Sequence, residues 1–143
     1  MATERRSRCV WEGGLADGTG HVTFESSGVI KDLEVTWASR TEEPQGRTSP
    51  EELIAAAHAA CFSMALSHAL GEAGTPPERL EVGATVGFQG GVGITGIQLD
   101  VRGTVPGISK ESFTEAAEGA KEGCPVSQAL AAVDISLTAE LTG

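Results

Sequence analysis

The longest apolar stretch of the chain lies between residues 48 and 71, and its two acidic residues both stand near its start. Ser49 is a favourable N-cap, Pro50 suits the first helical position, and Glu52 stands where a capping box requires an acid. Glycines and two prolines close the stretch after residue 71. Apolar residues, many of them alanine, occupy nearly every side between these signals. The pattern therefore predicts one long central helix that is buried all round.

Alternating apolar and polar positions predict about six strands. These cover residues 7–12, 21–25, 33–39, 79–89, 94–105 and 133–141. Ser109 is a good N-cap for a second helix over residues 110–122, and a third, short helix is expected over residues 125–131. Since no linker or repeat interrupts the 143 residues, the chain is predicted to be one domain of residues 1–143. The order of elements predicts an α+β fold with antiparallel sheet.

The central helix also predicts a quaternary structure. A helix of roughly 22 residues is about 33 Å long, and six strands can cover only one face of it. An alanine-rich helix that is apolar all round therefore needs a partner. We expect a homodimer in which two such helices pack together, since two-fold pairing is the commonest oligomeric solution.

Composition and charge narrow the class of protein. Twenty acidic against ten basic residues give a net charge of −10, which argues against binding nucleic acid or an anionic membrane surface. The central helix carries histidines and capping signals, so a transmembrane role is not expected either. No secretory signal follows the N-terminal arginines, and the cytoplasm is the expected compartment. An odd count of three cysteines in a reducing compartment argues against a structural disulfide framework, but a transient redox pair remains open.

Two of the three cysteines stand where a thiol could react. Cys61 lies in the middle of the central helix, where core packing is the alternative explanation. Cys124 precedes Pro125 at a predicted helix N-terminus, where free N–H groups favour a thiolate. Local chemistry alone therefore makes Cys124 the better nucleophile. Cys9, in the first strand, is expected to be structural or incidental.

A reactive Cys61 would need a nearby cation, because a thiol with a pKa near 8.5 is only about 3% ionised at pH 7. Arg40 and Arg47, in the loop before the central helix, are the available candidates. Glu51 could orient Arg40 through a bidentate pair, although an acid in the first turn of a helix needs no further explanation. Glu51 and Cys61 are separated by about 15 Å along one helix. A shared site therefore requires a bridging arginine or a contribution from the partner subunit.

The histidines of the central helix leave a metal site open. His58 and His68 lie on a stripe similar to that of Cys61, so either could join Cys61 and Cys124 in binding zinc. The usual short-spaced ligand pairs are absent, however. A buried histidine with a backbone partner is the favoured interpretation for both residues.

Two segments of the sequence, PEELIAAAHAACFSMAL and GCPVSQAL, carry a specific resemblance. Together with WEGGLADGTGHVTFESSG and VPGI, they are similar to the OsmC/Ohr family, the osmotically inducible and organic hydroperoxide resistance proteins. The likeness covers nearly the whole chain. The form AAHAACFSMAL looks more like the osmotically inducible subgroup.

The resemblance implies a thiol-dependent peroxidase with an intertwined α+β homodimer and sites at the subunit interface. By motif, Cys61 would attack the peroxide, Cys124 would resolve the resulting sulfenic acid by forming a disulfide, Arg40 would activate Cys61, and Glu51 would hold Arg40. Organic hydroperoxides are the implied substrates, hydrogen peroxide a poorer one, and a dithiol such as a dihydrolipoyl protein the implied reductant, in defence against oxidative or osmotic stress. No cofactor or resident metal is expected. The resemblance makes Cys61 the nucleophile, whereas local chemistry alone favours Cys124. If Cys61 has this role, Arg40 must approach it closely.

Two alternatives remain beside the peroxidase. The first is a non-enzymatic member of the same fold that binds small hydrophobic ligands and holds its thiols too far apart to pair. The second is the Cys/His metal-binding protein described above.

Overall fold

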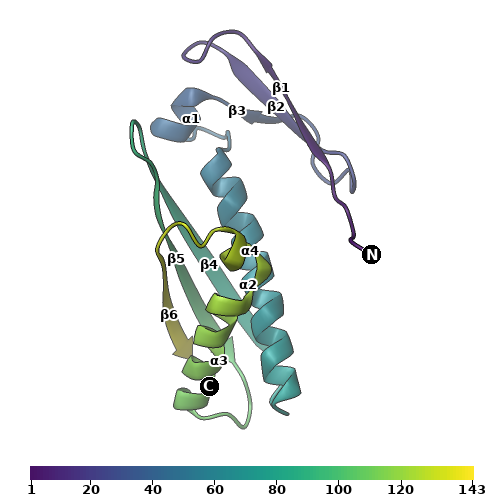
Figure 1. Ribbon diagram of the computed structural model, residues 1–143, viewed down its shortest axis with the longest axis vertical. Coiled ribbons are helices and arrows are strands. Elements are labelled where there is room, and N and C mark those ends of the chain that lie inside the picture. Colours follow the sequence, from purple (N-terminus) through teal and green to yellow (C-terminus); the bar gives the residue numbers. More distant parts are fainter. The chain divides into compact units, whose positions relative to one another are not determined.

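The computed structural model describes residues 1–143 and divides them into two compact units, residues 1–53 and 54–143 (Figure 1). The chain runs through β1 (Ser7–Glu12), β2 (Thr19–Phe24), β3 (Leu33–Val35), α1 (Trp37–Thr41), α2 (Pro50–Glu72), β4 (Arg79–Gln89), β5 (Gly93–Thr104), α3 (Lys110–Gly123), α4 (Pro125–Ala129) and β6 (Ile135–Leu141). The long helix α2 begins in the first unit and continues through the second. An α+β fold with six strands is confirmed, but there are four helices rather than three. The prediction of a single domain stays a prediction.

The first unit is built on an antiparallel sheet in the order β1-β2-β3. In its register Cys9 lies opposite Val22, and Gly20 lies opposite both Trp11 and Val35. A Cβ atom on Gly20 would come within 2.8 Å of both the Trp11 ring and the Val35 side chain. Glycine is therefore required where these two side chains close over the middle of the sheet.

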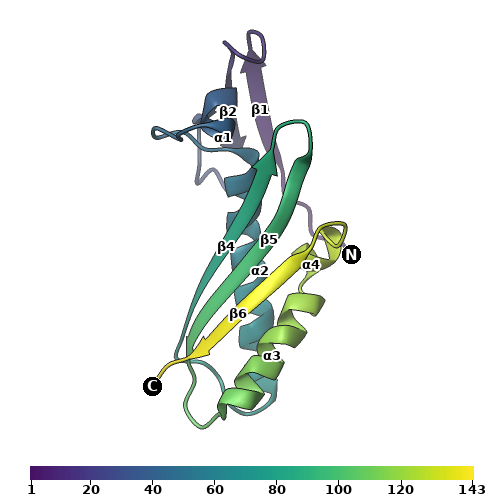
Figure 2. The same ribbon diagram turned by 90° about the vertical axis from the view of Figure 1, so that its left-hand side faces the viewer.

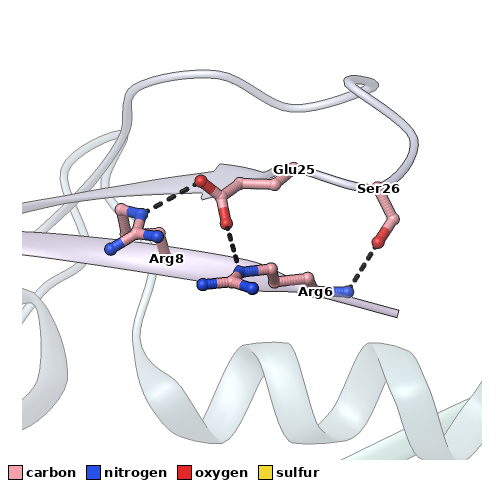
Figure 3. Close-up of polar contacts among 4 residues, drawn as sticks. All are labelled: Arg6, Arg8, Glu25 and Ser26. Atoms are coloured by element: carbon pink, nitrogen blue, oxygen red, sulfur yellow. Dashed lines mark hydrogen bonds and ion pairs between the residues drawn. The ribbon is translucent and has the colours of Figure 1, made fainter. Parts of the chain in front are cut away.

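Ion pairs join the open end of the β1–β2 hairpin (Figure 3). The carboxylate of Glu25 accepts from Arg8 Nε at 3.0 Å and from Arg6 Nε at 3.1 Å, and the Arg6 backbone N–H donates to the Ser26 hydroxyl. The hydrogen bond from Arg8 holds the pKa of Glu25 below its usual value. All these groups are exposed, so their main effect is to fix the register of the hairpin.

The predicted third strand is too long, because a short helix replaces its second half. The strand ends at Val35, and Thr36 caps α1. The Thr36 hydroxyl accepts from Ser39 N at 3.0 Å, and the Ser39 hydroxyl accepts from Thr36 N at 2.9 Å. This reciprocal capping box outweighs the strand propensity of the segment. Arg40 consequently lies on a helix rather than in the loop predicted before the central helix.

The start of α2 agrees in part with the sequence pattern. The Ser49 hydroxyl accepts from Glu52 N at 3.1 Å, as an N-cap should. The reciprocal half of the predicted capping box is wrong, because the Glu52 carboxylate accepts from the Thr48 hydroxyl at 2.6 Å instead. At the other end, the chain leaves the helix through Gly74, whose φ of +85° is left-handed and suits glycine.

The second unit contains a mixed sheet in the order β4-β5-β6. Strands β4 and β5 form the predicted antiparallel hairpin, but β6 runs parallel to β5, pairing Leu99 with Leu137. The prediction of purely antiparallel sheet is therefore wrong for β6. The reason lies in the connection, since α3 and α4 form the crossover that a parallel pair requires. Figure 2 shows α2 and α3 on the same face of this sheet.

The core of the second unit lies between these two helices and the sheet. Its central side chains are fully or almost fully buried: Phe62, Leu66, Leu70, Leu99, Val101, Phe113 and Ala117. Gly103 on β5 allows the close approach of α3, because a Cβ atom there would fall 2.6 Å from the Phe113 ring. Burial of this cluster, at about 25 cal/mol per Å² of apolar surface, is the main stabilising contribution to the unit.

Only one stripe of α2 is buried in the single chain. His58, Phe62, Leu66 and Leu70, spaced four residues apart, face the core. On the opposite side Ala56, Ala57, Ala60, Met64, Ser67 and His68 are exposed. The prediction of a helix buried all round is thus wrong for one copy of the chain. By length and composition α2 could also cross a membrane, a test that the core helix of a soluble protein passes too.

Candidate active site

The fold brings Cys61 and Cys124 together, although 62 residues separate them in the sequence. Cys61 projects from the middle of α2, and Cys124 lies at the junction between α3 and α4, where it is the C-cap of one helix and the N-cap of the other. The two thiols are within hydrogen-bonding range of each other, and both are reduced. Two neighbouring thiols are the arrangement that a redox-active cysteine pair requires.

The surroundings shift the pKa values of the two thiols in opposite directions. Burial raises the pKa of Cys61, and its contact with Cys124 adds to the rise, although a backbone N–H of Val126 opposes it. Burial acts on Cys124 in the same direction, but hydrogen bonds from the Ser127 hydroxyl and backbone N–H outweigh it and lower the pKa of Cys124. Cys124 is the more acidic thiol, as its local sequence predicts. It is also fully buried, whereas Cys61 is partly exposed.

Ser127 is a site residue that the sequence analysis did not identify. Its backbone N–H donates to Cys124 Sγ at 3.3 Å, and its hydroxyl oxygen lies 3.3 Å from the same sulfur. The spacing of an N-cap and the third helical position in Cys124-Pro-Val-Ser127 is the same as in a capping box, and this was the available signal. The His58 ring completes the group, because its Nε2 atom lies 2.7 Å from Ser127 Oγ. His58 is buried as expected, but its partner is this hydroxyl rather than a backbone group.

Arg40 and Glu51 form the predicted bidentate pair in the first unit. Arg40 Nε lies 3.0 Å and 3.2 Å from the two carboxylate oxygens, and Arg40 Nη2 lies 2.8 Å from the second. The Glu51 side chain is only 7% exposed and that of Arg40 29%, so the pair is shielded from screening by water. The Arg40 guanidinium also lies 6.0 Å from the Trp37 ring centroid. These contacts fix the direction of one partly exposed cation.

The other candidates have ordinary structural surroundings. Arg47 Nε forms an ion pair with Glu34 at 3.1 Å, which stabilises its loop. His68 is exposed rather than buried, so the expectation of a buried ring is wrong for this residue. Cys9 is exposed on β1. Next to Cys61, Phe62 is fully buried in the core, whereas Met64 is 72% exposed.

A metal site is not assembled from these residues. No group of three His, Cys, Asp or Glu side chains in the chain is placed to hold a metal ion. His58, the histidine close to the thiols, uses Nε2 for Ser127. The ligand set that a zinc site would need from Cys61, Cys124 and a histidine is therefore not formed.

The sequence matches known proteins over nearly its whole length. A family model described as OsmC-like protein matches residues 40–138. The chain is 44% identical to Peroxiredoxin OsmC of Escherichia coli (strain K12), over 99% of both proteins. It is 31% identical to Organic hydroperoxide resistance protein OhrB of Bacillus subtilis (strain 168), over 82% of this chain and 87% of that protein.

Solved structures agree with the fold. The crystal structure of the organic hydroperoxide resistance protein from Elizabethkingia anophelis superposes with a TM-score of 0.70 at 27% identity, covering 99% of this chain and 100% of that one. The Bacillus subtilis OhrB structure gives a TM-score of 0.65 at 27% identity, covering 96% and 98%. These similarities extend over both units of the chain.

Proposed function

Because the chain belongs to the OsmC-like protein family, we propose that it is a thiol-dependent peroxidase that reduces organic hydroperoxides, and hydrogen peroxide less efficiently. The observation that carries the proposal is the contact between the partly exposed Cys61 and the buried Cys124. A relative named peroxiredoxin and another named for resistance to organic hydroperoxides support it.

The exposure of the two thiols supports the roles proposed for them. A peroxide arriving from solvent can meet Cys61, whereas Cys124 has no exposed surface. This difference supports Cys61 as the proposed attacking thiol, although Cys124 is the more acidic of the two. Burial disfavours the Cys61 thiolate, so an approaching cation must stabilise it.

Arg40 is the cation proposed for this task, and Glu51 holds it. A guanidinium near Cys61 would lower the pKa of the thiol and donate to the peroxide oxygen on which charge develops. Glu51 and Cys61 lie about 15 Å apart along one helix. The Arg40 side chain therefore either spans that interval or comes from a second copy of the chain.

The proposed cycle has three steps. The Cys61 thiolate attacks the distal oxygen of the hydroperoxide, the O–O bond breaks, and the alkoxide leaves as an alcohol after gaining a proton, leaving Cys61 as sulfenic acid. Cys124 then attacks the sulfur of the sulfenic acid, forming a disulfide and releasing water. A dithiol reductant, for which a dihydrolipoyl protein is proposed, restores both thiols by exchange.

A homodimer is the proposed assembly, with α2 at its centre. The exposed side of α2 is lined by small and apolar side chains, including Ala57, Ala60 and Met64. Such a surface allows two helices to come close together. This assembly could bring the Arg40–Glu51 pair of one copy near the thiols of the other. The cytoplasm is the proposed compartment, and oxidative or osmotic stress defence the proposed role.

The hydrophobic ligand binder is the weaker candidate. That alternative assumed that the thiols are too far apart to pair, whereas they are in contact. An open pocket of the second unit, about 580 Å³ in volume, is lined by polar groups as well, among them His68, Glu78 and Arg79. It gives no reason to prefer a purely hydrophobic ligand.

Steady-state consumption of cumene hydroperoxide, with a dithiol as the reductant, tests the proposal. We expect turnover by the wild-type protein, faster than with hydrogen peroxide, and none by Cys61→Ser. The Cys9→Ser variant is the matched control and should turn over at the wild-type rate. Undiminished turnover by Cys61→Ser would show that the attacking group is misassigned.

A further inference from the structure

His58 is a buried polar side chain that the proposed peroxidase cycle does not use. The ring has no exposed surface, and its Nδ1 atom has no hydrogen-bond partner. Burying an unpaired nitrogen destabilises a fold, so an apolar side chain would fill this position at a lower cost in free energy. A histidine at this position therefore needs an explanation, and the contacts of its second ring nitrogen are where to look for one.

The other nitrogen, Nε2, begins a buried series of hydrogen-bond contacts that ends at the resolving thiol, Cys124. Nε2 lies 2.7 Å from Ser127 Oγ, and Ser127 Oγ lies 3.3 Å from Cys124 Sγ. Ser127 is 4% exposed and Cys124 fully buried, so water does not compete for these contacts. Every member of this series is held on a helix or at a helix cap of the second unit.

Burial indicates which atoms carry the protons in the hydrogen bonds that link His58, Ser127 and Cys124. Desolvation lowers the pKa of His58, so the ring is neutral near pH 7 and one of its nitrogens carries a proton. A buried N–H without a partner is rarer in proteins than an unpaired acceptor, which places the proton on Nε2. Nε2–H then donates to Ser127 Oγ. The Cys124 thiol also donates to Ser127 Oγ while it is protonated, and once Cys124 ionises the Ser127 hydroxyl can turn and donate to the thiolate.

Few other groups could compete for these protons. The titratable groups in or next to this series of hydrogen bonds are the Cys61 thiol from α2, the Cys124 thiol and the His58 ring. The residues that β5, β6 and α3 contribute to the surrounding core, such as Leu99, Leu137 and Ala120, are apolar. Within the second unit the buried polar side chains are His58 and Ser127, and no carboxylate, lysine or arginine is buried there.

We propose that His58 and Ser127 are positioning residues for the second chemical step, in which they hold a hydroxyl donor against the Cys124 thiolate that attacks the Cys61 sulfenic acid. In this step the S–S bond forms as the S–O bond of the sulfenic acid breaks. Hydroxide leaves and combines with the proton that Cys124 gave up on ionisation, so the products are the disulfide and water. The Cys61 sulfur is reduced and the Cys124 sulfur is oxidised by the same electron pair. The inference rests on the proposed function, since it assigns a role within that cycle.

One test needs no peroxide. In a Cys9→Ser, Cys61→Ser background, Cys124 is the only thiol, and the ultraviolet absorbance of its thiolate across a pH series reports its ionisation without a reagent having to reach the buried sulfur. We expect Ser127→Ala and His58→Phe to reduce the thiolate fraction of Cys124 near neutral pH about tenfold. Ser127→Thr, which keeps the hydroxyl, should restore most of it. Ser112→Ala, at an exposed serine on α3, is the matched control and should leave the profile unchanged.

A single-turnover experiment separates the two steps of the cycle in the Cys9→Ser protein. Sulfenic acid trapped by a dimedone-type reagent reports the first step, and loss of the second thiol reports disulfide formation. We expect Ser127→Ala to slow disulfide formation about tenfold relative to sulfenic-acid formation. If folded Ser127→Ala and His58→Phe, judged by circular dichroism, both keep the thiolate absorbance profile of the parent protein, the positioning role is wrong. If one of them does not fold, the other decides.

The two failures are distinguishable. Absence of any trapped sulfenic acid in the Cys124→Ser variant would overturn the proposed function. An unchanged Cys124 profile would overturn only the role of His58 and Ser127. A merely structural role for these residues would lower stability without changing the ratio of the two rates.

Discussion

At the scale of single residues, the feature that most constrains the chemistry is the fixed pair of Arg40 and Glu51. Three hydrogen bonds of 2.8 to 3.2 Å hold the guanidinium in one plane. Lysine could keep the charge at this position but could not reproduce the two-pronged contact. The proposed peroxidase therefore depends on the direction of the cation as well as on its presence.

Glu51→Gln should reduce kcat/KM for cumene hydroperoxide about a hundredfold, because a misplaced catalytic group costs roughly this factor. Glu52→Gln is the matched control. The neighbouring Glu52 carboxylate bonds Thr48 instead of Arg40, so its loss should leave the rate within about twofold of the wild type. Equal losses in the two variants would contradict a role for Glu51 in holding Arg40.

The pH dependence of the first step tests the role of Arg40. Burial raises the pKa of Cys61, so without a nearby cation fewer molecules carry the thiolate at neutral pH. The rate of sulfenic-acid formation should increase with pH as Cys61 ionises, and Arg40→Ala should move the midpoint to higher pH. Rates of trapping across a pH series measure this midpoint. An unchanged midpoint would mean that Arg40 does not act on Cys61.

At the scale of elements, α1 determines where Arg40 lies. The helix has only five residues, and such a length is not stable by propensity alone. Its N-terminus is fixed by the Thr36–Ser39 capping box, and the Ser39 hydroxyl also donates to the Thr48 carbonyl oxygen at 2.8 Å. The same serine thus links the end of β3 to the start of α2 within the first unit.

Thr36→Ala should lower the free energy of unfolding by about 1 kcal/mol, the usual effect of losing an N-cap side chain. Denaturant unfolding measures this change. Thr41→Ala, at the exposed end of the same helix, should change stability by less than about 0.5 kcal/mol. If Thr41→Ala is the more destabilising of the two, the cap does not hold α1.

Elements also show which parts of the structure the sequence could predict. The boundaries of α2 and of the β4–β5 hairpin follow from strong periodicity and clear stop signals. The sequence pattern does not predict helix α1, because residues 33–39 alternate as a strand would and the Thr36–Ser39 capping spacing is a weaker signal than this alternation. The parallel pairing of β6 depends on a partner distant in sequence, which local pattern does not specify.

Some features of the candidate site could likewise be predicted from the sequence, and others could not. The pairing of Cys61 with Cys124 and of Arg40 with Glu51 agrees with the motifs and with ion-pair chemistry. The sequence does not mark Ser127 as a site residue, because a serine near a helix start already has an ordinary capping role. The different surroundings of the two thiols depend on burial, which only the folded chain determines.

At the scale of the whole molecule, the exposed side of α2 is the feature that one copy of the chain leaves unexplained. Met64 is the largest apolar side chain on that side, and alanines surround it. Sequence pattern predicted apolar residues all round this helix but not which of them the chain itself covers. A second copy packed on the exposed side would account for both observations.

Met64→Glu should dissociate the proposed homodimer, because two carboxylates would then be buried opposite each other. Analytical ultracentrifugation over a concentration series measures the shift toward monomer. Thr114→Glu, at an exposed position of α3, is the control and should leave the mass unchanged. A wild-type protein that is monomeric at every concentration would contradict the proposed assembly.

The central claim is that peroxide oxidises Cys61 and that Cys124 resolves it. The most direct measurement treats the reduced protein with one equivalent of cumene hydroperoxide, counts free thiols, and maps the disulfide by peptide mass spectrometry. The account predicts the loss of two of the three thiols, a Cys61–Cys124 disulfide, and a free Cys9. A disulfide involving Cys9, or full retention of the Cys61 thiol while the peroxide is consumed, would contradict it.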